Sequence, residues 1–152
     1  MRKILSIIFI FIIIVNISAC KSVEVPPIQD IVDEITSNVT FTELYPASDD
    51  TILQDMGIKT DMFTEKVSLL PSDALQANRI FIFKATDDNN SQIIYDKLDK
   101  YLGVQKTRSQ DYSPAMYAIF NKTGVVRKGL FVYLIVNDDI STATNIIKKY
   151  IK

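Results

Sequence analysis

Apolar and polar side chains follow two periods along this chain, one typical of helices and one typical of strands. Over residues 28–38 the apolar side chains recur every three or four positions, at Ile28, Ile31, Val32 and Ile35. This spacing predicts an amphipathic helix, and Pro27 directly before it is a natural start. Similar patterns predict four more helices, over residues 50–56, 90–102, 114–120 and 140–151.

Polar, proline and glycine residues mark the predicted helix ends. Side chains that cap a helix N-terminus come before four of the helices, at Ser48-Asp49-Asp50, residues 87–91 (DDNNS), Ser113-Pro114 and Asp138-Asp139. Gly57 and Gly103 stand where two of the helices are expected to end.

Two segments are apolar without alternation and predict strands that are buried on both sides. They are residues 79–85 (RIFIFKA) and 130–136 (LFVYLIV), rich in β-branched and aromatic side chains. Shorter strands are predicted over 66–70 and 125–127. Because strands that are apolar on both sides are usually covered twice, we expect helices on both faces of the sheet.

The predicted cover divides the helices between the two faces. We expect helices 90–102 and 140–151 on one face, and helix 28–38 with the segment 41–57 on the other. The competing hypothesis leaves the second face open for a partner. The pattern as a whole predicts a single α+β domain over residues 28–152, with a four-stranded antiparallel or mixed sheet and packed helices.

The N-terminus has the three-part layout of a secretory signal peptide. Arg2 and Lys3 precede a mostly apolar run of 14 residues from Ile4 to Ile17, and small residues follow. As a helix this run would span about 21 Å, short of the roughly 30 Å hydrocarbon core of a bilayer. We therefore predict a signal peptide over residues 1–19. The alternatives are a buried core helix and an uncleaved anchor.

The sequence Ile17-Ser18-Ala19-Cys20 resembles the lipobox of bacterial lipoproteins, in which the cysteine is diacylated and the chain is cut before it. Cys20 is the only cysteine. The resemblance implies that Cys20 is lipidated and anchors the chain, since two acyl chains are enough for stable attachment to a membrane. The alternatives are a buried free cysteine and an ordinary signal peptidase site. Residues 20–27 predict an extended tether of at most roughly 25 Å. The expected location is the extracytoplasmic face of the bacterial cell membrane.

Composition excludes several classes of function. The chain of 152 residues has no histidine, which excludes a histidine-centred triad and a histidine-ligated metal. A single cysteine excludes an internal disulfide and a thiolate zinc site. The net charge of −1, which becomes −3 without residues 1–19, lacks the basic excess that nucleic acids select. Because no phosphate-binding loop motif is present either, we expect neither a nucleic-acid partner nor a cofactor.

Three kinds of side chain could still carry chemistry. Paired carboxylates can bind a metal, yet the three Asp doublets each precede a predicted helix and are interpreted as caps. The segment DDNNS also lacks the glycine and the distal glutamate of a calcium loop. A serine nucleophile paired with a distant lysine would be Ser68, Ser91 or Ser113. Five tyrosines could line a ligand cleft but are interpreted as half-buried core, namely Tyr95, Tyr101, Tyr112, Tyr117 and Tyr150. We therefore expect no catalytic or metal-binding residue and no enzyme.

Several segments resemble a family of small lipoproteins of Gram-positive bacteria known as domain of unknown function 4358. Besides the cysteine and the tether, they are IVDEITSNV, MGIKTDMFTEKVSLLP, RIFIFKATDDNN and GLFVYLIVNDD. The resemblance covers residues 20–152 and implies no substrate, cofactor or catalytic residue.

The function expected from these observations is that of a membrane-anchored binding or accessory module of the cell envelope, with an envelope protein as partner. One alternative is an envelope hydrolase with an unrecognised site. Another is a small-ligand receptor subunit of a transporter. A deep pocket with converging polar groups would favour the receptor, whereas a flat apolar patch would favour a protein partner.

Overall fold

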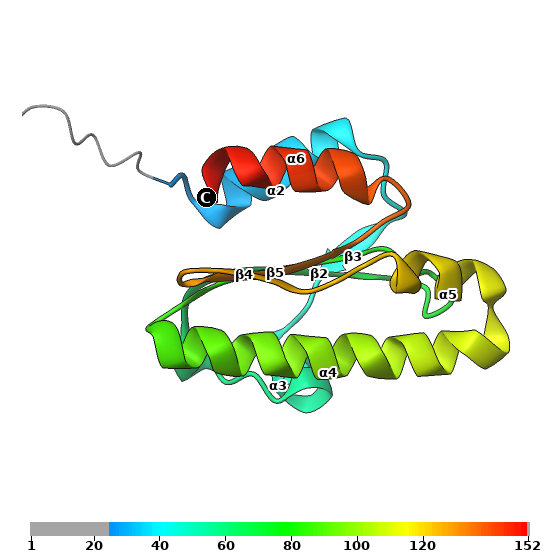
Figure 1. Ribbon diagram of the computed structural model, residues 1–152, viewed down its shortest axis with the longest axis horizontal. Coiled ribbons are helices and arrows are strands. Elements are labelled where there is room, and N and C mark those ends of the chain that lie inside the picture. Colours follow the sequence, from blue (N-terminus) through cyan, green and yellow to red (C-terminus); the bar gives the residue numbers. More distant parts are fainter. Residues whose placement is uncertain (1–24, 152) are drawn as a thin grey trace, which may run out of the picture.

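The computed structural model describes residues 25–151 (Figure 1). Its α-helices are α2 (Ile28–Asn38), α3 (Asp49–Met56), α4 (Asp88–Tyr112), α5 (Pro114–Asn121) and α6 (Ile140–Tyr150). Its strands are β1 (Leu44–Pro46), β2 (Phe63–Pro71), β3 (Arg79–Ala85), β4 (Val126–Lys128) and β5 (Phe131–Val136). One turn of 3-10 helix, Thr60–Met62, precedes β2. The predicted signal peptide, Cys20 and most of the predicted tether lie outside the described residues.

The sheet is antiparallel throughout, with the strand order β1-β2-β3-β5-β4. The prediction of an α+β domain is confirmed, and of the two kinds of sheet considered the antiparallel one is found. The predicted number of four strands is wrong, because β1 adds a fifth. β1 has three residues, includes Pro46 and pairs with β2 at the edge of the sheet. So short a strand has no periodic pattern, and proline is tolerated there because an edge strand needs fewer hydrogen bonds.

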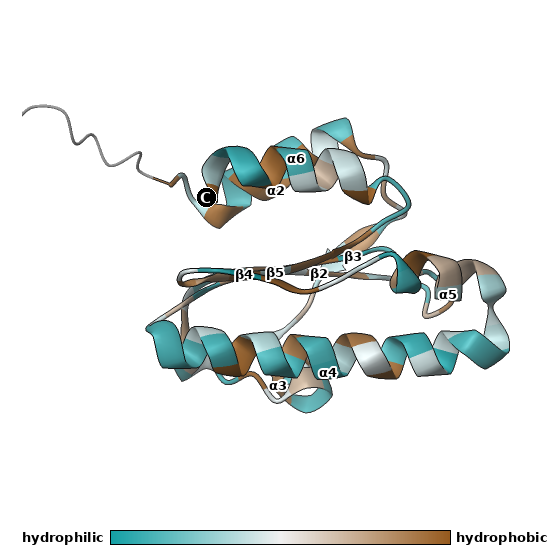
Figure 2. Ribbon diagram, viewed as in Figure 1, coloured by the Kyte–Doolittle hydropathy of each residue, from teal (hydrophilic) through white to brown (hydrophobic). Residues whose placement is uncertain are grey.

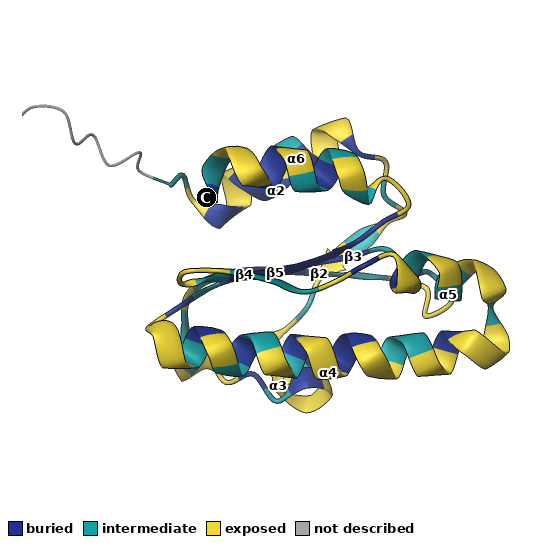
Figure 3. Cartoon of the chain, in the orientation of Figure 1, coloured by how far each residue is buried: buried dark blue, intermediate teal, exposed yellow. Residues whose placement is uncertain are grey.

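Helices cover both faces of this sheet (Figure 1). Side chains alternate along β3. Phe81 and Phe83 pack in the core between the sheet and α4, whereas Ile80 and Ile82 pack in the core between the sheet and the helices α2 and α6. All four side chains are fully buried. β5 alternates in the same way, so β3 and β5 are apolar on both sides. Figures 2 and 3 show the sheet edge-on as a largely hydrophobic and buried layer between the helices. The predicted double cover is confirmed, and the hypothesis of an open second face is wrong.

The division of the helices between the faces differs from the prediction. α3, α4 and α5 lie on one face, and α2 and α6 lie together on the other (Figure 1). The sequence pattern places α6 with α4 and α3 with α2. In the structure the apolar stripes of α2 and α6 complete one layer, and Glu34 of α2 accepts hydrogen bonds from Lys149 and Tyr150 of α6. These contacts join residues more than a hundred positions apart, which a local pattern does not reveal.

α4 is longer than predicted. The predicted helix ends before Gly103, yet α4 has 25 residues and continues to Tyr112. A glycine inside a helix costs only about 1 kcal/mol, and α5 packs against the added turns (Figure 1). The added turns position Val104 and Arg108 beside the end of α3. Within residues 25–151, none of the helices combines the length and the apolar character needed to cross a bilayer.

Candidate functional site

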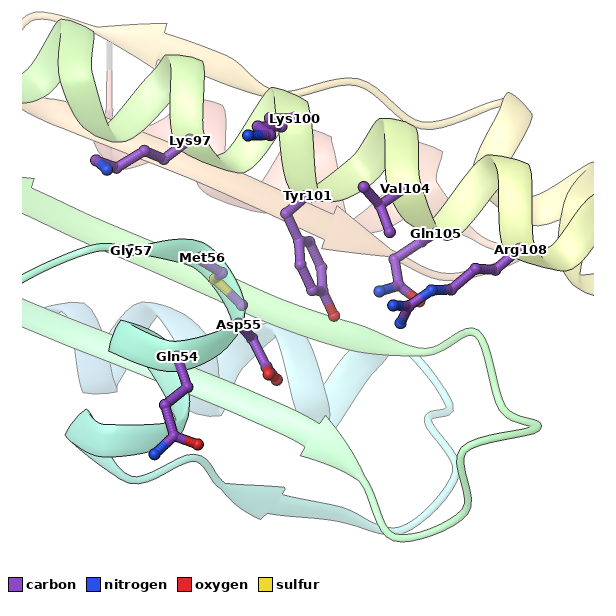
Figure 4. Close-up of a pocket in the computed structure, with 10 residues that line it drawn as sticks. All are labelled: Gln54, Asp55, Met56, Gly57, Lys97, Lys100, Tyr101, Val104, Gln105 and Arg108. Carbon is purple, nitrogen blue, oxygen red and sulfur yellow. The ribbon is translucent and has the colours of Figure 1, made fainter.

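A hollow of about 480 Å³ lies between the end of α3 and the middle of α4 (Figure 4). It is lined by residues 54–57 and by six residues of α4 between Lys97 and Arg108, and we call it the α3–α4 groove. Its volume falls within the range of roughly 300–1,000 Å³ that small-molecule sites occupy. The groove is therefore large enough for a small organic ligand.

Gly57 shapes one wall of the groove by ending α3. Its φ of 70° is left-handed, a conformation that glycine adopts without steric cost, and its N–H donates to the carbonyl of Leu53. A Cβ at this position would stand 3.0 Å from Lys97 Nζ. The Lys97 ammonium therefore lies against the C-terminal turn of α3, where the helix dipole favours a positive charge.

The opposite wall is one side of α4. Lys97, Tyr101, Val104 and Arg108 are spaced by three or four positions and so share this side of the helix. Val104 is 39% exposed and places an apolar side chain on this wall between the charged side chains. Because α4 packs on β3, β4 and β5 and on α5, these side chains stand on a well-supported element.

Tyr101 forms the floor of the groove and is only 7% exposed. Its ring meets Phe81 edge to face, with 5.6 Å between the ring centroids. Its hydroxyl oxygen accepts a hydrogen bond of 2.5 Å from Nη1 of Arg79. Burial raises the pKa of the Tyr101 hydroxyl, against the opposing effect of the Arg79 guanidinium. The hydroxyl is therefore protonated at neutral pH and can donate to a ligand.

Arg79 is a buried cation beneath this floor, with 5% of its surface exposed. It donates to the carbonyls of Ala77 at 2.9 Å and Gln76 at 3.0 Å, and it lies 4.9 Å from the centroid of the Phe120 ring. None of the ion pairs formed within residues 25–151 includes it. Carbonyl dipoles, a hydroxyl and an aromatic face thus surround the charge without neutralising it.

The groove has an excess of positive charge. Lys97, Lys100 and Arg108 contribute three cations, against one carboxylate from Asp55. The chain as a whole has a net charge of −1. The local excess therefore makes the groove a place where an anion is favoured.

A second hollow of about 240 Å³ adjoins the groove and shares Gln105 and Arg108 with it. Leu75 and Tyr112 border this second hollow and are 70% and 85% exposed. Exposed large apolar side chains that gather in one place mark a surface suited to binding. We call it the apolar hollow.

The predicted caps are confirmed. Asp87 and Asp139 accept hydrogen bonds from the first turns of α4 and α6, and Ser48 caps α3, whose first turn holds Asp49 and Asp50. Among residues 25–151, no three His, Cys, Asp or Glu side chains gather in a way that could hold a metal ion. In the doublets, Asp87 and Asp139 cap helices, while Asp49 and Asp88 form ion pairs with Lys66 and Arg127.

The three serines considered as nucleophiles lie on different elements. Ser113 caps α5, Ser91 accepts a 2.7 Å hydrogen bond from Nε of Arg127, and Ser68 is buried in β2 without a hydrogen-bond partner in the described part of the chain. In that same part, none of them forms a hydrogen bond with a lysine. They do not form a common site.

The tyrosines do not share one cleft. Tyr101 lines the groove and Tyr112 borders the apolar hollow, whereas Tyr150 contacts Glu34 on the other face of the sheet. Arg79 was not among the residues predicted from the sequence to have a role, although a charged residue at the start of a strand that is apolar on both sides was a usable sign. Asp55 and Arg108 carry no comparable sign, since each lies on an exposed helix position.

Fold and groove define a small α+β domain with two covered sheet faces and a cationic hollow beside its longest helix. Residues 37–137 match the family described as Domain of unknown function (DUF4358), which is most of the chain, so the protein belongs to that family. The predicted membership of this family is confirmed over residues 37–137, whereas its description as a family of lipoproteins of Gram-positive bacteria stays a prediction. No curated protein and no solved structure matches the chain.

Proposed function

We propose that this protein is a lipoprotein of the extracytoplasmic face of the bacterial cell membrane that binds a ligand in the α3–α4 groove. The observation that carries the proposal is the groove itself, a hollow of about 480 Å³ that is lined by a buried tyrosine and three cations. A concave site with a few convergent polar groups is typical of small-ligand binding. The proposal thus favours the receptor among the functions considered from the sequence.

Two observations weigh against the other functions. Both sheet faces are covered by the chain's own helices, so the sheet leaves no broad apolar face to an envelope protein. Within residues 25–151, none of Ser68, Ser91 and Ser113 forms a hydrogen bond with a lysine that could activate it. A hydrolase therefore gains no support from these serines.

The direction in which the chain enters the domain supports an anchored orientation. α2 follows the predicted tether and lies on the opposite face of the sheet from α3 and α4 (Figure 1). A tether that reaches at most roughly 25 Å would hold the layer of α2 and α6 next to the bilayer. The groove would then open away from the membrane, toward ligands of the envelope.

The anchor is tested by mass spectrometry of the membrane fraction. We expect a mature chain that begins at Cys20 and carries acyl mass. A Cys20→Ala chain from which residues 1–19 have been removed is expected to leave the membrane fraction. A mature chain with another N-terminus would contradict the anchor.

The groove is tested by a photo-crosslinking amino acid placed at Val104 in living cells. We expect a discrete adduct mass on the Val104 variant. The same amino acid at Ser141, an exposed position of α6, is the control and is expected to give none. Equal adducts at both positions, or none at either, would contradict binding through the groove.

A further inference from the structure

We propose that the α3–α4 groove binds a soluble amphiphilic anion, with a phosphate-type headgroup carried on an apolar body. The inference rests on the proposed function, because it names the class of ligand that the groove would take. The charge of the groove, the proton of a buried hydroxyl and the neighbouring apolar hollow each support it.

The charge of the groove selects a dianion. Lys97, Lys100 and Arg108 outnumber Asp55 on its walls, and Arg79 adds a buried cation beneath its floor. A guanidinium pairs with two oxygens of a phosphate-type group at once, so Arg108 is the cation that would contact the headgroup directly. The ammonium groups of Lys97 and Lys100, farther along α4, would favour the same negative charge at longer range. Such a ligand would also supply the negative charge that Arg79 lacks in residues 25–151.

The floor of the groove supplies a hydrogen-bond donor. The Tyr101 hydroxyl oxygen accepts from Arg79, and within residues 25–151 its own proton has no acceptor. In Figure 4 the hydroxyl end of Tyr101 points into the space between Asp55 and Arg108. A guanidinium that bonds to a hydroxyl oxygen polarises the O–H bond, which strengthens donation to an anion.

The apolar hollow accounts for the body of the ligand. It shares Arg108 and Gln105 with the groove, so a headgroup near Arg108 would place its substituent against Leu75 and Tyr112. Covering these exposed side chains would remove apolar surface from water and add to the affinity. An inorganic anion would lack this contribution.

The position of the groove favours a soluble ligand over a lipid of the anchoring membrane. α2, which follows the tether, and the groove lie on opposite faces of the sheet (Figure 1). The tether is attached on the side of the domain opposite the groove, which leaves the groove open to soluble ligands. Phospholipid headgroups also contain a phosphate group, so the test includes phospholipid vesicles as well as a soluble ligand.

The test is isothermal titration calorimetry of the full chain in neutral detergent with phenylphosphonate, a phosphate-type anion on an apolar ring. We expect saturable binding, about tenfold tighter than that of inorganic phosphate, because the ring adds buried apolar area. Arg108→Gln and Tyr101→Phe are each expected to weaken binding about tenfold or more, since each removes a hydrogen bond to a charged group. Lys148→Gln removes an exposed cation of α6 and is the matched control, with unchanged affinity expected.

A lack of saturable phenylphosphonate binding would overturn the proposal. An equal loss of affinity in Lys148→Gln and Arg108→Gln would overturn it as well. Binding to phosphatidylglycerol vesicles that Arg108→Gln abolishes, without any response to phenylphosphonate, would overturn the assignment to a soluble ligand. If Tyr101→Phe fails to fold, Arg108→Gln decides the test, because Arg108 is exposed.

Failure of this proposal is distinguishable from failure of the proposed function. A groove that takes a neutral ligand would still give the Val104 adduct in cells while phenylphosphonate fails to bind. A protein that does not act through the groove would give no such adduct.

Discussion

Arg79 and Tyr101 connect the core of the domain to the floor of the groove. The guanidinium donates to the hydroxyl and to two backbone carbonyls, and all of these partners are neutral. Burying a cation among neutral partners costs desolvation energy that each hydrogen bond partly offsets. Loss of one partner therefore weakens the fold as well as the site.

Tyr101→Phe removes the acceptor and keeps the ring. We expect the free energy of unfolding to fall by about 1–2 kcal/mol, the cost of leaving a buried donor unsatisfied. Urea denaturation of the full chain in neutral detergent measures it. Tyr112→Phe is the control, because Tyr112 is 85% exposed and its change is expected to stay within about 0.5 kcal/mol. Equal losses in the two variants would contradict this account of the pair.

The caps could be predicted from sequence, whereas the groove could not. Asp87 accepts from the N–H of Asn90, three positions along the chain, so donor and acceptor appear in one short motif. Arg79 and Tyr101 are 22 positions apart, on a strand and a helix. Their meeting depends on how α4 lies on the sheet, and that placement leaves no local pattern.

The ends of the helices also could not all be predicted from local sequence patterns. Gly57 and Gly103 look alike in sequence, since each follows a helical segment. Gly57 ends α3 with a φ of 70°, but Gly103 lies inside α4. Tertiary packing of α5 on α4 overrides the weak helix preference of glycine at the second position.

Alanine at these two glycines is expected to have opposite effects. Gly57→Ala should lower the free energy of unfolding by about 1 kcal/mol, because alanine is strained at this φ and its Cβ would stand 3.0 Å from Lys97 Nζ. Gly103→Ala should raise it by about 0.5–1 kcal/mol, because nothing lies within 4 Å of the new Cβ and alanine favours the helix. Denaturant unfolding measures both, and changes of the same sign would contradict the two backbone assignments.

α2 and α6 are joined by a contact that titrates. The hydrogen bonds from Lys149, at 2.6 Å, and from Tyr150, at 2.5 Å, lower the pKa of the Glu34 carboxyl below its ordinary value of 4.5. A pKa lowered by folding means that the carboxylate stabilises the fold above the unfolded pKa. This stabilisation disappears as the pH falls through the lower pKa of the folded state.

Glu34→Gln and Lys149→Gln are therefore expected to lower the melting temperature at pH 7. For Glu34→Gln the difference from the unmodified protein should shrink below about pH 4.5, as the native carboxyl takes up a proton. Lys148→Gln, at the neighbouring exposed position, is the control and should have little effect. Thermal melts from pH 3 to pH 7 measure this, and a difference for Glu34→Gln that is independent of pH would count against the contact.

The domain as a whole is a sheet between two helical layers that have different roles. The layer of α2 and α6 is continuous with the predicted tether, and the layer of α3, α4 and α5 contains the groove. Double cover of the sheet was predictable, because residues 80–83 of β3 and all of β5 are apolar and their neighbouring side chains face opposite layers. The layer that each helix joins was not predictable, because both faces of the sheet are apolar and α6 could pack on either.

We expect ligand binding to belong to the layer of α3 and α4 and to leave the layer next to the tether unaffected. The test is to follow amide chemical shifts of the 15N-labelled full chain in neutral detergent during titration with phenylphosphonate. We expect saturable shifts at Gly57, Tyr101 and Arg108 and none along α2 and α6. Shifts confined to α2 and α6, or shifts that never saturate, would contradict the claim.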